Sequence, residues 1–450
     1  MPWWWWFACT EPDAPTESVD TDVVVDSPTV DSDADDRAWL EQPPEAADLD
    51  EDPDVVHVQL TAAPFVHDIG GEAVEGYAYS GSTPGPTLRG EVGDTLIVEL
   101  QNDLPDATTI HWHGLEVPYD MDGVTWQRDP VAAGGSFTYS FTLTKAGTYW
   151  YHPHFDSNEQ VSRGLYGVLV VEDPSDPAPA QELILVLDDW LLAELADDEG
   201  VHGDHGLEGV WTSNGQISPR WEAPDGVTRV RILNASNAGY VKLAWPSMRV
   251  LGTERGIGGG LTTPDSLVLG PGDRAEAEWL GGDFLVEDHP YSLHGGEAYG
   301  EVAEVLLVEG AALDDDGLAW PFHGEAPTPD PGRTDIVYVF SGDAGEWFIN
   351  GEQFPDVTIE ELILGDEVVI EVRNLSPTRH PFHLHGLTFE VLSSAGTPPA
   401  WRSRQDTVDV GVHEAVRLLV TANNPGDWMT HCHILPHAEQ GMMTVLRVAE

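Results

Sequence analysis

Cys432 stands between two histidines in the segment T-H-C-H-I-L-P-H-A-E-Q-G-M-M. On an extended segment successive side chains point to opposite faces, so His431 and His433 share one face and the Cys432 thiolate lies on the other. His437 and Met442 follow at spacings that let a loop or helical turn return toward Cys432. A thiolate, an imidazole and a weak thioether are three of the four ligands of a blue-copper electron-transfer site. The missing imidazole must come from elsewhere in the chain.

Three further histidine clusters occur: H-W-H-G at 111–114, H-P-H at 152–154 and H-P-F-H-L-H-G at 380–386. Each holds one His-x-His pair, so with the pair around Cys432 the chain has four pairs and eight imidazoles. Eight imidazoles are enough to build a three-copper cluster, and the remaining His380 completes the mononuclear site.

Ordinary structural histidines do not account for four such pairs together with a bracketed cysteine. The histidines outside the clusters have no comparable pattern, and we interpret them as surface or core residues. Examples are His202, His205 and His413.

The motifs H-W-H-G, H-P-H, H-P-F-H-L-H-G and H-C-H-x3-H-x4-M, in this order, resemble the four copper motifs of the multicopper oxidases. The similarity is greatest to bacterial laccases, copper-efflux oxidases and bilirubin oxidases, and it covers about residues 55–450. It implies four copper ions, one of type 1, one of type 2 and two of type 3. The implied type 1 ligands are His380, Cys432, His437 and Met442. The implied type 2 ligands are His111 and His383, and the implied type 3 ligands are His113, His152, His154, His385, His431 and His433.

Reduction of dioxygen also needs protons. In the bacterial enzymes that this chain resembles, an aspartate soon after H-W-H-G serves the three-copper cluster, and Asp122 matches that position. Many of them also carry a glutamate directly after the last type 1 histidine. This chain has Ala438 there and Glu439 one place later. Asp122 and Glu439 are therefore the candidate catalytic carboxylates, and a surface role is the alternative for Glu439.

The elements that must position these ligands are short strands. From Val55 onward, apolar alternations such as V-V-H-V-Q-L, D-T-L-I-V-E-L and S-F-T-Y-S-F-T-L are broken by Gly and Pro, as in β-sandwiches. We predict an all-β fold of three cupredoxin-like Greek-key β-sandwich domains, at 55–173, 180–312 and 333–450. Only the first and third carry copper motifs, so the three-copper cluster must lie between them. These two also share the pattern G-D-x-x-x-V/I-E before a histidine cluster, which fits duplicated units.

The N-terminal region has a different composition. Residues 1–9, M-P-W-W-W-W-F-A-C, resemble the end of a truncated bacterial lipoprotein signal, in which Cys9 would be lipidated. The alternative is a mis-set start or a genuinely cytosolic N-terminus, with Cys9 as a free thiol. Residues 10–54 are acidic and rich in Pro, Ser and Thr, so we predict a disordered tether. The expected location is periplasmic or extracellular, with a possible membrane anchor through Cys9.

The formal net charge of the chain is −60, from 79 acidic and 19 basic residues. Such a surface repels nucleic acid and favours cationic partners. Because the acidic residues are spread over the whole chain, adaptation to a salty environment explains them better than a focused cation site. We expect a monomer whose partners are dioxygen and a small reducing substrate.

The implied enzyme is a laccase-like oxidoreductase. It would couple one-electron oxidation of phenolic, aromatic-amine or metal-ion donors at type 1 copper to the four-electron reduction of dioxygen to water at the trinuclear copper cluster. The alternatives are a metallo-oxidase for Cu(I), Fe(II) or Mn(II) in metal detoxification, and a non-catalytic copper-binding protein on the same scaffold. The six methionines form no Met-rich insert, which disfavours cuprous ion as a dedicated substrate. Asp406 and Asp409 are candidates to receive donors at the type 1 mouth.

Overall fold

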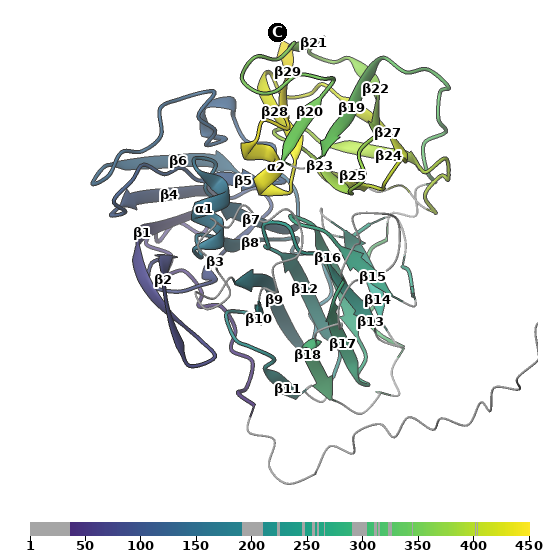
Figure 1. Cartoon of the computed structure of the whole chain (residues 1–450). Helices are drawn as coiled ribbons and strands as arrows, with labels where there is room; N and C mark the ends of the chain where they lie inside the picture. The colour runs from purple at the N-terminus through teal and green to yellow at the C-terminus, as the bar shows by residue number, and fades with distance from the viewer. Residues whose placement is uncertain are drawn as a thin grey trace, which may run out of the picture. The chain divides into compact units, whose positions relative to one another are not determined.

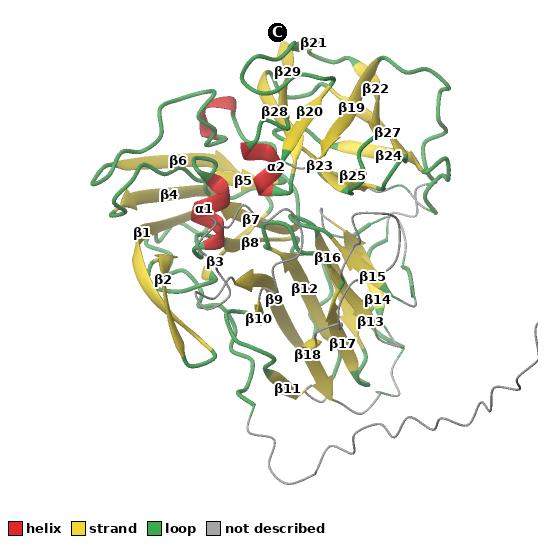
Figure 2. Ribbon diagram, viewed as in Figure 1, coloured by secondary structure: helices red, strands yellow, loops and turns green. Residues whose placement is uncertain are grey.

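The computed structural model describes residues 37–190, 210–222, 226–244, 248–253, 257–258, 261–264, 266–289, 304–309, 313, 316–322, 326–343, 345–400, 402 and 404–450. The strands of these residues form six sheets, and the only helices among them are short: η1 (Tyr119–Met121), α1 (Ser157–Ser162) and α2 (Leu435–Glu439). No helix in this part of the chain is long and apolar enough to cross a membrane. The predicted all-β fold is confirmed (Figure 2).

The first two sheets lie within the range predicted for the first sandwich (Figure 1). One sheet has the order β2-β1-β4-β6, with strands Glu72–Tyr79, Val55–Ile69, Thr95–Asn102 and Ser136–Thr142. The other has the order β3-β8-β7-β5, with strands Gly85–Glu91, Gly167–Glu172, Gly147–His152 and His111–His113. Valine, leucine and tyrosine side chains from both sheets fill one core.

The middle pair of sheets carries no histidine motif. One sheet has the order β10-β9-β12-β16-β14, with strands Val210–Ser213, Gln181–Trp190, Thr228–Asn234, Arg274–Trp279 and Arg249–Thr253. The other has the order β11-β18-β17-β13-β15, with strands Arg220–Glu222, Glu304–Glu309, Phe284–Asp288, Val241–Ala244 and Leu267–Leu269.

The third pair contains the C-terminal half of the histidine motifs. One sheet has the order β20-β19-β22-β27-β24-β25, with strands Glu346–Ile349, Ile336–Asp343, Glu367–Asn374, Ala415–Thr421, Phe389–Ser394 and Arg404–Gln405. The other has the order β21-β29-β28-β23-β26, with strands Glu360–Ile363, Met443–Ala449, Gly426–Cys432, His380–Leu384 and Thr407–Val410.

The same strand pairing recurs in all three pairs of sheets. In each, the first long strand runs parallel to the next central one, as β1 with β4, β9 with β12 and β19 with β22. In the second sheet of each pair, an early strand runs parallel to the late strand beside it, as β3 with β8, β11 with β18 and β21 with β29. The duplication suggested by the sequence therefore extends to three copies of one topology. The exact domain boundaries stay predictions.

A buried asparagine ends the corresponding strand of each copy: Asn102 of β4, Asn234 of β12 and Asn374 of β22. Each side-chain NH₂ donates to two or more backbone carbonyl groups, and each side-chain oxygen accepts a backbone N–H two residues later. This asparagine corner fixes the segment that leads into the next strand. In the first and third copies that strand begins with a histidine, at His111 and His380.

The predicted tether over residues 10–54 needs correction for residues 37–54. Leu40 is buried in the core of the middle pair, and its N–H donates to Arg220 O at 2.8 Å. Glu45 forms a short bridge with Thr87 in the first pair, in which the Ala46 N–H donates to Thr87 O at 2.9 Å. Sheet edges with unpaired backbone groups capture this acidic segment, although its own composition gives it few apolar anchors. Residues 10–36 and Cys9 lie outside the described part of the chain.

Candidate metal centre

The four His-x-His pairs lie on short strands or at their ends. β5 carries the first pair, and β7 pairs antiparallel with it, so that His111 lies opposite His152. β23 and β28 pair in the same way in the third pair of sheets, with His383 opposite His431. The residues between the histidines point the other way, because Trp112, Leu384 and Cys432 belong to the hydrophobic cores. The alternation predicted from the sequence is therefore confirmed.

Eight imidazoles converge on one buried region. Stacked rings join the two halves, with ring centroids 3.8 Å apart for His111 and His385 and 3.8 Å for His113 and His383. Potential ligand atoms lie within 4.8 Å of one another in three groups made only of these histidines: His111/His383/His385, His111/His113/His152 and His154/His385/His431. His433 joins them, with its ring centroid 4.9 Å from that of His113 and 5.6 Å from that of His152.

A second group contains the cysteine. The Sγ atom of Cys432 lies 3.3 Å from His380 Nδ1 and 3.6 Å from His437 Nδ1, and those two nitrogens are 3.2 Å apart. Met442 is fully buried in the same core, and its carbonyl accepts the Cys432 N–H at 3.2 Å. The loop through α2 thus returns Met442 to the cysteine, as its spacing predicted. The peptide bonds on either side of Cys432 join this group to the eight-histidine group.

Most of the eight rings use one nitrogen to donate to a protein oxygen. The acceptors are Asp122 O for His111, Pro153 O for His152, Asp406 O for His383, Asp122 Oδ2 for His385 and Cys432 O for His431, at 2.9–3.0 Å. The opposite nitrogens of His111, His152 and His383 are buried and have no hydrogen-bond partner among the described residues. A buried polar atom without a partner is costly unless it binds something. These rings therefore fit metal ions as ligands.

Pairs of histidine ring nitrogens that face each other also indicate metal binding. His385 Nε2 lies 3.0 Å from His431 Nε2, and His154 Nε2 lies 3.5 Å from His431 Nε2. Since His385 and His431 donate through their other nitrogen, two lone pairs point at each other across this gap. A cation between them converts that repulsion into coordination.

The electrostatics keep the imidazoles neutral. Burial, followed by repulsion from neighbouring imidazoles, lowers the pKa of His113, His383 and His385 well below its ordinary value. Burial lowers the pKa of His431 to about 4. Burial also raises the pKa of the Cys432 thiol. Metal binding requires neutral imidazole and deprotonated thiol, and a metal ion bound to the sulfur supplies the positive charge that a buried thiolate needs.

The two candidate catalytic carboxylates, Asp122 and Glu439, differ in their burial and in their contacts. Asp122 is fully buried, its Oδ2 lies 3.0 Å from His385 Nδ1, and its Oδ1 lies 3.1 Å from His111 Nδ1. Gln127, which is partly exposed, donates to the same carboxylate at 3.2 Å. Glu439 is exposed on α2 and accepts the Asn158 N–H of α1 at 3.0 Å. Its described hydrogen bonds include no histidine of either group, and its role in proton delivery stays a prediction.

The prediction that Asp406 lies at the mouth of the type 1 site was wrong. Its side chain is fully buried, and its Oδ1 lies 3.0 Å from His113 Nε2 rather than at a type 1 mouth. The reason is strand register: β26 pairs antiparallel with β23, so Thr407 lies opposite His383 and Asp409 opposite Pro381, beside His380. Asp409 accepts hydrogen bonds from Arg379 and Tyr240.

Sequence reasoning missed several side chains that contact the ligands. Ser376 Oγ lies 2.7 Å from His380 Nε2, and the Trp347 ring lies 4.0 Å from the His437 ring. Thr407 Oγ1 lies 3.0 Å from His113 Nε2 and 3.1 Å from His383 Nδ1. No local pattern in the sequence singles these residues out, because their partners lie on other elements of the fold.

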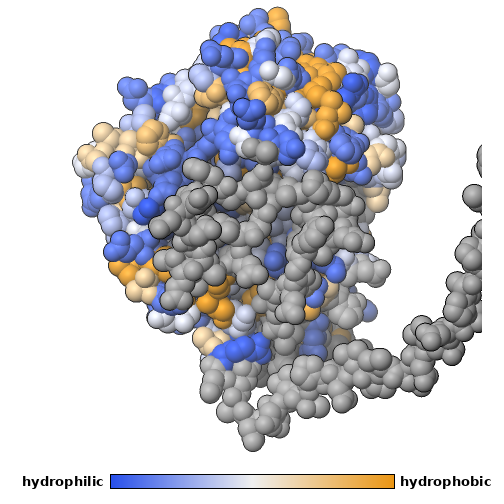
Figure 3. Space-filling model, in the orientation of Figure 1, coloured by the Kyte–Doolittle hydropathy of each residue, from blue (hydrophilic) through white to orange (hydrophobic). Residues whose placement is uncertain are grey.

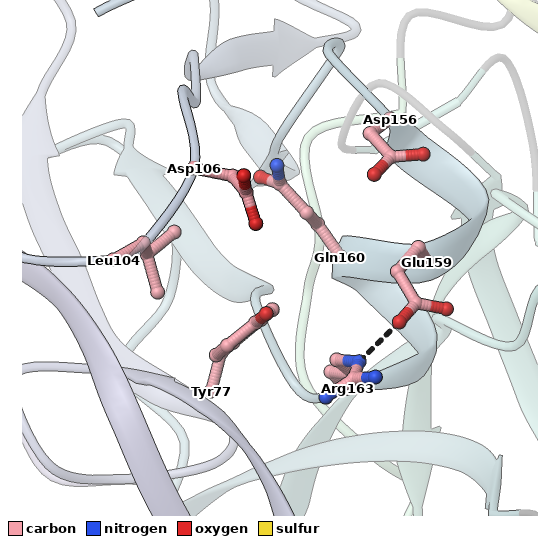
Figure 4. A pocket seen from close by; sticks show the side chains of 7 residues that line it. All are labelled: Tyr77, Leu104, Asp106, Asp156, Glu159, Gln160 and Arg163. Atoms are coloured by element: carbon pink, nitrogen blue, oxygen red, sulfur yellow. Dashed lines mark hydrogen bonds and ion pairs between the residues drawn. The ribbon is translucent and has the colours of Figure 1, made fainter. Parts of the chain in front are cut away.

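A small hollow of about 190 Å³ lies beside α1 and is separate from both groups (Figure 4). Asp106, Asp156 and Glu159 line it together with Arg163, which is ion-paired with Glu159 at 2.5 Å. None of the ten clustered histidines lines this hollow.

Comparison with known proteins agrees with this geometry. The family model described as multicopper oxidase matches residues 65–176, and a second model with the same description matches 328–450. A multicopper oxidase of Mycobacterium tuberculosis is 32% identical over 87% of this chain and 86% of its own length. The chain belongs to the multicopper oxidase family. It is a copper-dependent oxidoreductase that couples oxidation of a reducing substrate to reduction of dioxygen, and the family binds four coppers of types 1, 2 and 3.

Two further relatives of this multicopper oxidase differ in their named activity. A laccase of Pycnoporus cinnabarinus is 26% identical, with 87% of this chain and 89% of the laccase covered. The solved structure of a multicopper oxidase from Campylobacter jejuni, described as a metallo-oxidase, superposes with a TM-score of 0.80 at 27% identity. That superposition covers 92% of this chain and 96% of the other.

Proposed function

We propose that this multicopper oxidase holds type 1 copper in the cysteine group and types 2 and 3 in the eight-histidine group. The observation that carries the assignment is the convergence of residues from 111–154 and 383–433 on one buried region joined to Cys432 by two peptide bonds. The proposed type 1 ligands are His380, Cys432, His437 and Met442. The proposed type 2 ligands are His111 and His383, and the proposed type 3 ligands are His113, His152, His154, His385, His431 and His433.

When bound, copper supplies one-electron chemistry at the mononuclear site and the four-electron reduction of dioxygen to water at the cluster. The protein contributes neutral imidazoles held in one tautomer by oxygen acceptors, and a buried pocket that excludes bulk water. Cys432 and its two histidine neighbours give the shortest covalent connection between the two groups.

We also propose that Asp122 delivers protons to the cluster. It is the buried carboxylate in contact with His111 and His385, and Gln127 links it toward the surface. Glu439 is the second proposed carrier, beside the acidic α1 region; partial burial of its carboxyl, together with the charges of Asp156 and Glu159, raises its pKa against the opposing hydrogen bond from Asn158.

The donors are proposed to be phenols, aromatic amines or metal ions. Similarity to both a laccase and a metallo-oxidase supports this range, and a net charge of −60 favours cationic donors. A dedicated metallo-oxidase for Cu(I), Fe(II) or Mn(II) is the second candidate. A non-catalytic copper protein is less consistent with the complete set of twelve proposed ligands.

Two experiments test these assignments. The copper-loaded protein is expected to contain four coppers per chain, to show a blue band with a near-ultraviolet shoulder, and to consume dioxygen with a phenol or aromatic amine. One copper per chain, or no oxygen uptake with organic and metal donors alike, contradicts the proposal. Uptake with metal ions alone would select the metallo-oxidase.

The location is proposed to be periplasmic or extracellular, with the protein monomeric and anchored through lipidated Cys9. A chain expressed with a complete upstream signal is expected to fractionate with membranes, and Cys9→Ser to release it. Equal solubility of the two forms would leave Cys9 as a free thiol.

A further inference from the structure

The middle pair of sheets supplies no proposed copper ligand, yet one of its turns lies against the cluster. This turn connects β15 to β16 and contains Gly272, whose φ is +83°. A Cβ atom at Gly272 would lie 2.9 Å from Cγ and Nδ1 of His433. The turn therefore packs directly on a proposed type 3 ligand, and only a residue without a side chain fits there.

Arg274 follows the turn as the first residue of β16. Its guanidinium makes a two-pronged ion pair with Asp406, with Nη1 at 2.8 Å from Oδ1 and Nη2 at 2.7 Å from Oδ2. Nε donates to Thr148 O at 3.2 Å, and Nη1 also donates to Gly272 O at 3.1 Å. Both partners of the pair are fully buried. A planar guanidinium held at so many points has one orientation.

Asp406, which Arg274 holds in place, contacts two of the proposed ligands. Its Oδ1 lies 3.0 Å from His113 Nε2, and its backbone oxygen accepts from His383 Nδ1 at 3.0 Å. Thr407, whose hydroxyl donates to Asp406 Oδ1, lies between the same two rings. Because a proton on His113 Nε2 is held by the carboxylate, His113 Nδ1 is left as the nitrogen that faces the cluster; it has no hydrogen-bond partner among the described residues.

The glycine of H-W-H-G fits the same arrangement. Gly114 has a φ of +91°, and a Cβ atom there would lie 2.5 Å from Arg274 Nη2 and 2.8 Å from Asp406 Oδ2. The motif in the first pair of sheets therefore leaves room for an ion pair formed by the other two pairs. All three pairs of sheets meet at this point.

We propose that Arg274 is a positioning residue of the three-copper cluster. Through Asp406 it fixes the ring orientation and tautomer of His113 and His383, so the middle pair of sheets controls the geometry of a cluster to which it gives no ligand. This inference rests on the proposed function, since it takes His113 and His383 as cluster ligands. The alternative is an ion pair that only holds the three pairs of sheets together.

The experiment compares copper-loaded wild type with Arg274→Gln, Arg274→Lys and Asp406→Asn. The readouts are copper per chain, the ratio of the near-ultraviolet shoulder to the blue band, the rate of anaerobic reduction by a donor, and the rate of reoxidation of the reduced protein by dioxygen. Arg229→Gln is the matched control, because Arg229 is a buried arginine of the middle pair that binds Glu276 and Asp176.

Arg274→Gln and Asp406→Asn are expected to keep the blue band and the donor-reduction rate within about twofold. They should lose most of the near-ultraviolet shoulder and slow reoxidation about 10- to 100-fold, the usual effect of removing a partner of a metal ligand. Arg274→Lys keeps the charge without the two-pronged geometry and should fall between them and wild type. The control should keep both the spectral ratio and the reoxidation rate.

A wild-type ratio and reoxidation rate in Arg274→Gln would overturn the proposal. Equal losses in Arg229→Gln would also overturn the proposal, because they would show that the effect comes from a general disturbance of the fold. If Arg274→Gln does not fold, Arg274→Lys decides: unchanged cluster signatures in that variant contradict a positioning role. Failure of the proposed function is seen separately, as a wild-type protein without four coppers or without the shoulder.

Discussion

The imidazoles of the metal centre are oriented mainly by backbone carbonyl groups. Asp122 O, Pro153 O, Asp406 O and Cys432 O each accept one ring N–H. A carbonyl oxygen does not titrate, so these tautomers do not change with pH. Two others, His385 and His113, instead have the carboxylates of Asp122 and Asp406 as acceptors. Proton transfer and positioning are thus concentrated on two side chains.

Met442→Leu is expected to raise the type 1 redox potential while the blue colour remains. The substitution removes a weak sulfur donor but keeps volume in a fully buried site, so the loss in stability should stay below about 1.5 kcal/mol. Loss of the sulfur destabilises the cupric state more than the cuprous state. Redox titration with visible spectroscopy measures both effects. Cys432→Ser, in contrast, should abolish the blue band, and an unchanged potential in Met442→Leu would remove Met442 from the ligand set.

Asp122→Asn is expected to slow oxygen reduction about 10²- to 10⁴-fold, the range for loss of a general acid or base. The amide keeps the shape of the side chain but carries no transferable proton. Anaerobic reduction of the blue band by a donor should be unaffected, because the histidines that Asp122 contacts, His111 and His385, belong to the eight-histidine group. Stopped-flow measurement of the two half-reactions separates the steps. Glu439→Gln should have a smaller effect in the same direction, and equal slowing of both half-reactions would argue against proton delivery.

The strands that carry the ligands were largely predictable, and their supporting contacts were not. Alternation along H-W-H, H-L-H and H-C-H specifies which side chains share a face, and the structure confirms it. The register between strands that are distant in the sequence cannot be predicted from local residue patterns, so Asp406 was assigned to the wrong site. Three residues along β26, about 10 Å, separate the neighbourhood of His383 from that of His380. Arg274 was missed for the same reason, since its partner is 132 residues away.

Asn374→Ala is expected to loosen the loop that holds His380. The variant leaves the carbonyl groups of Thr378 and Val410 and the N–H of Ser376 without this partner, at a cost of about 2–4 kcal/mol. Ser376 contacts His380, so the blue band should shift or weaken.

Asn234→Ala is the matched control in the copy without a histidine motif. It should lose comparable stability in urea unfolding and keep the spectrum of the wild type. A shifted band in both variants, or in neither, would contradict a specific link between the asparagine corner and type 1 copper.

Glu276 is expected to make stability depend on pH in the acid range. Burial raises the pKa of Glu276, but Arg229 and Arg231 outweigh that effect and bring the pKa from 4.5 to about 2. A carboxyl with a lowered folded pKa stabilises the protein fully above pH 4.5 and loses that contribution as the pH falls toward 2. The contribution is about 3 kcal/mol. Urea unfolding of wild type and Glu276→Gln at equal copper loading should show the difference between them shrinking over this range. Glu72→Gln, at an exposed position of β2, is the control, and a constant difference would refute the assignment.

Acidic residues outnumber basic residues in this chain by 79 to 19. Figure 3 shows mostly hydrophilic side chains on the coloured part of one face, with hydrophobic ones scattered or in small groups. The ion pair that joins the middle pair of sheets to the third, Arg274 with Asp406, is by contrast buried and shielded from salt, and so is Arg231 with Glu276 within the middle pair. Salt therefore acts mainly on the unpaired surface charge.

Added salt is expected to stabilise this protein. With a net charge of −60, mutual repulsion of surface carboxylates opposes the compact state, and screening shortens its range. The melting temperature should rise between about 0.05 M and about 1 M NaCl. Calorimetry or circular dichroism measures it, with KCl at equal ionic strength as a control for ion-specific effects. A flat or falling melting temperature would exclude charge repulsion as a limit on stability.

The division of the cluster between residues 111–154 and 383–433 has a consequence for how the protein is made. Four of the eight histidines lie in the N-terminal part of the chain and are synthesised first. The ribosome then reaches the fifth, His383, only 229 positions after His154. The first pair of sheets can fold around its share, but the metal-binding pocket does not exist until β28 pairs with β23. A prematurely terminated chain therefore lacks both centres, and incorporation of the full metal complement reports that translation reached the C-terminal strands.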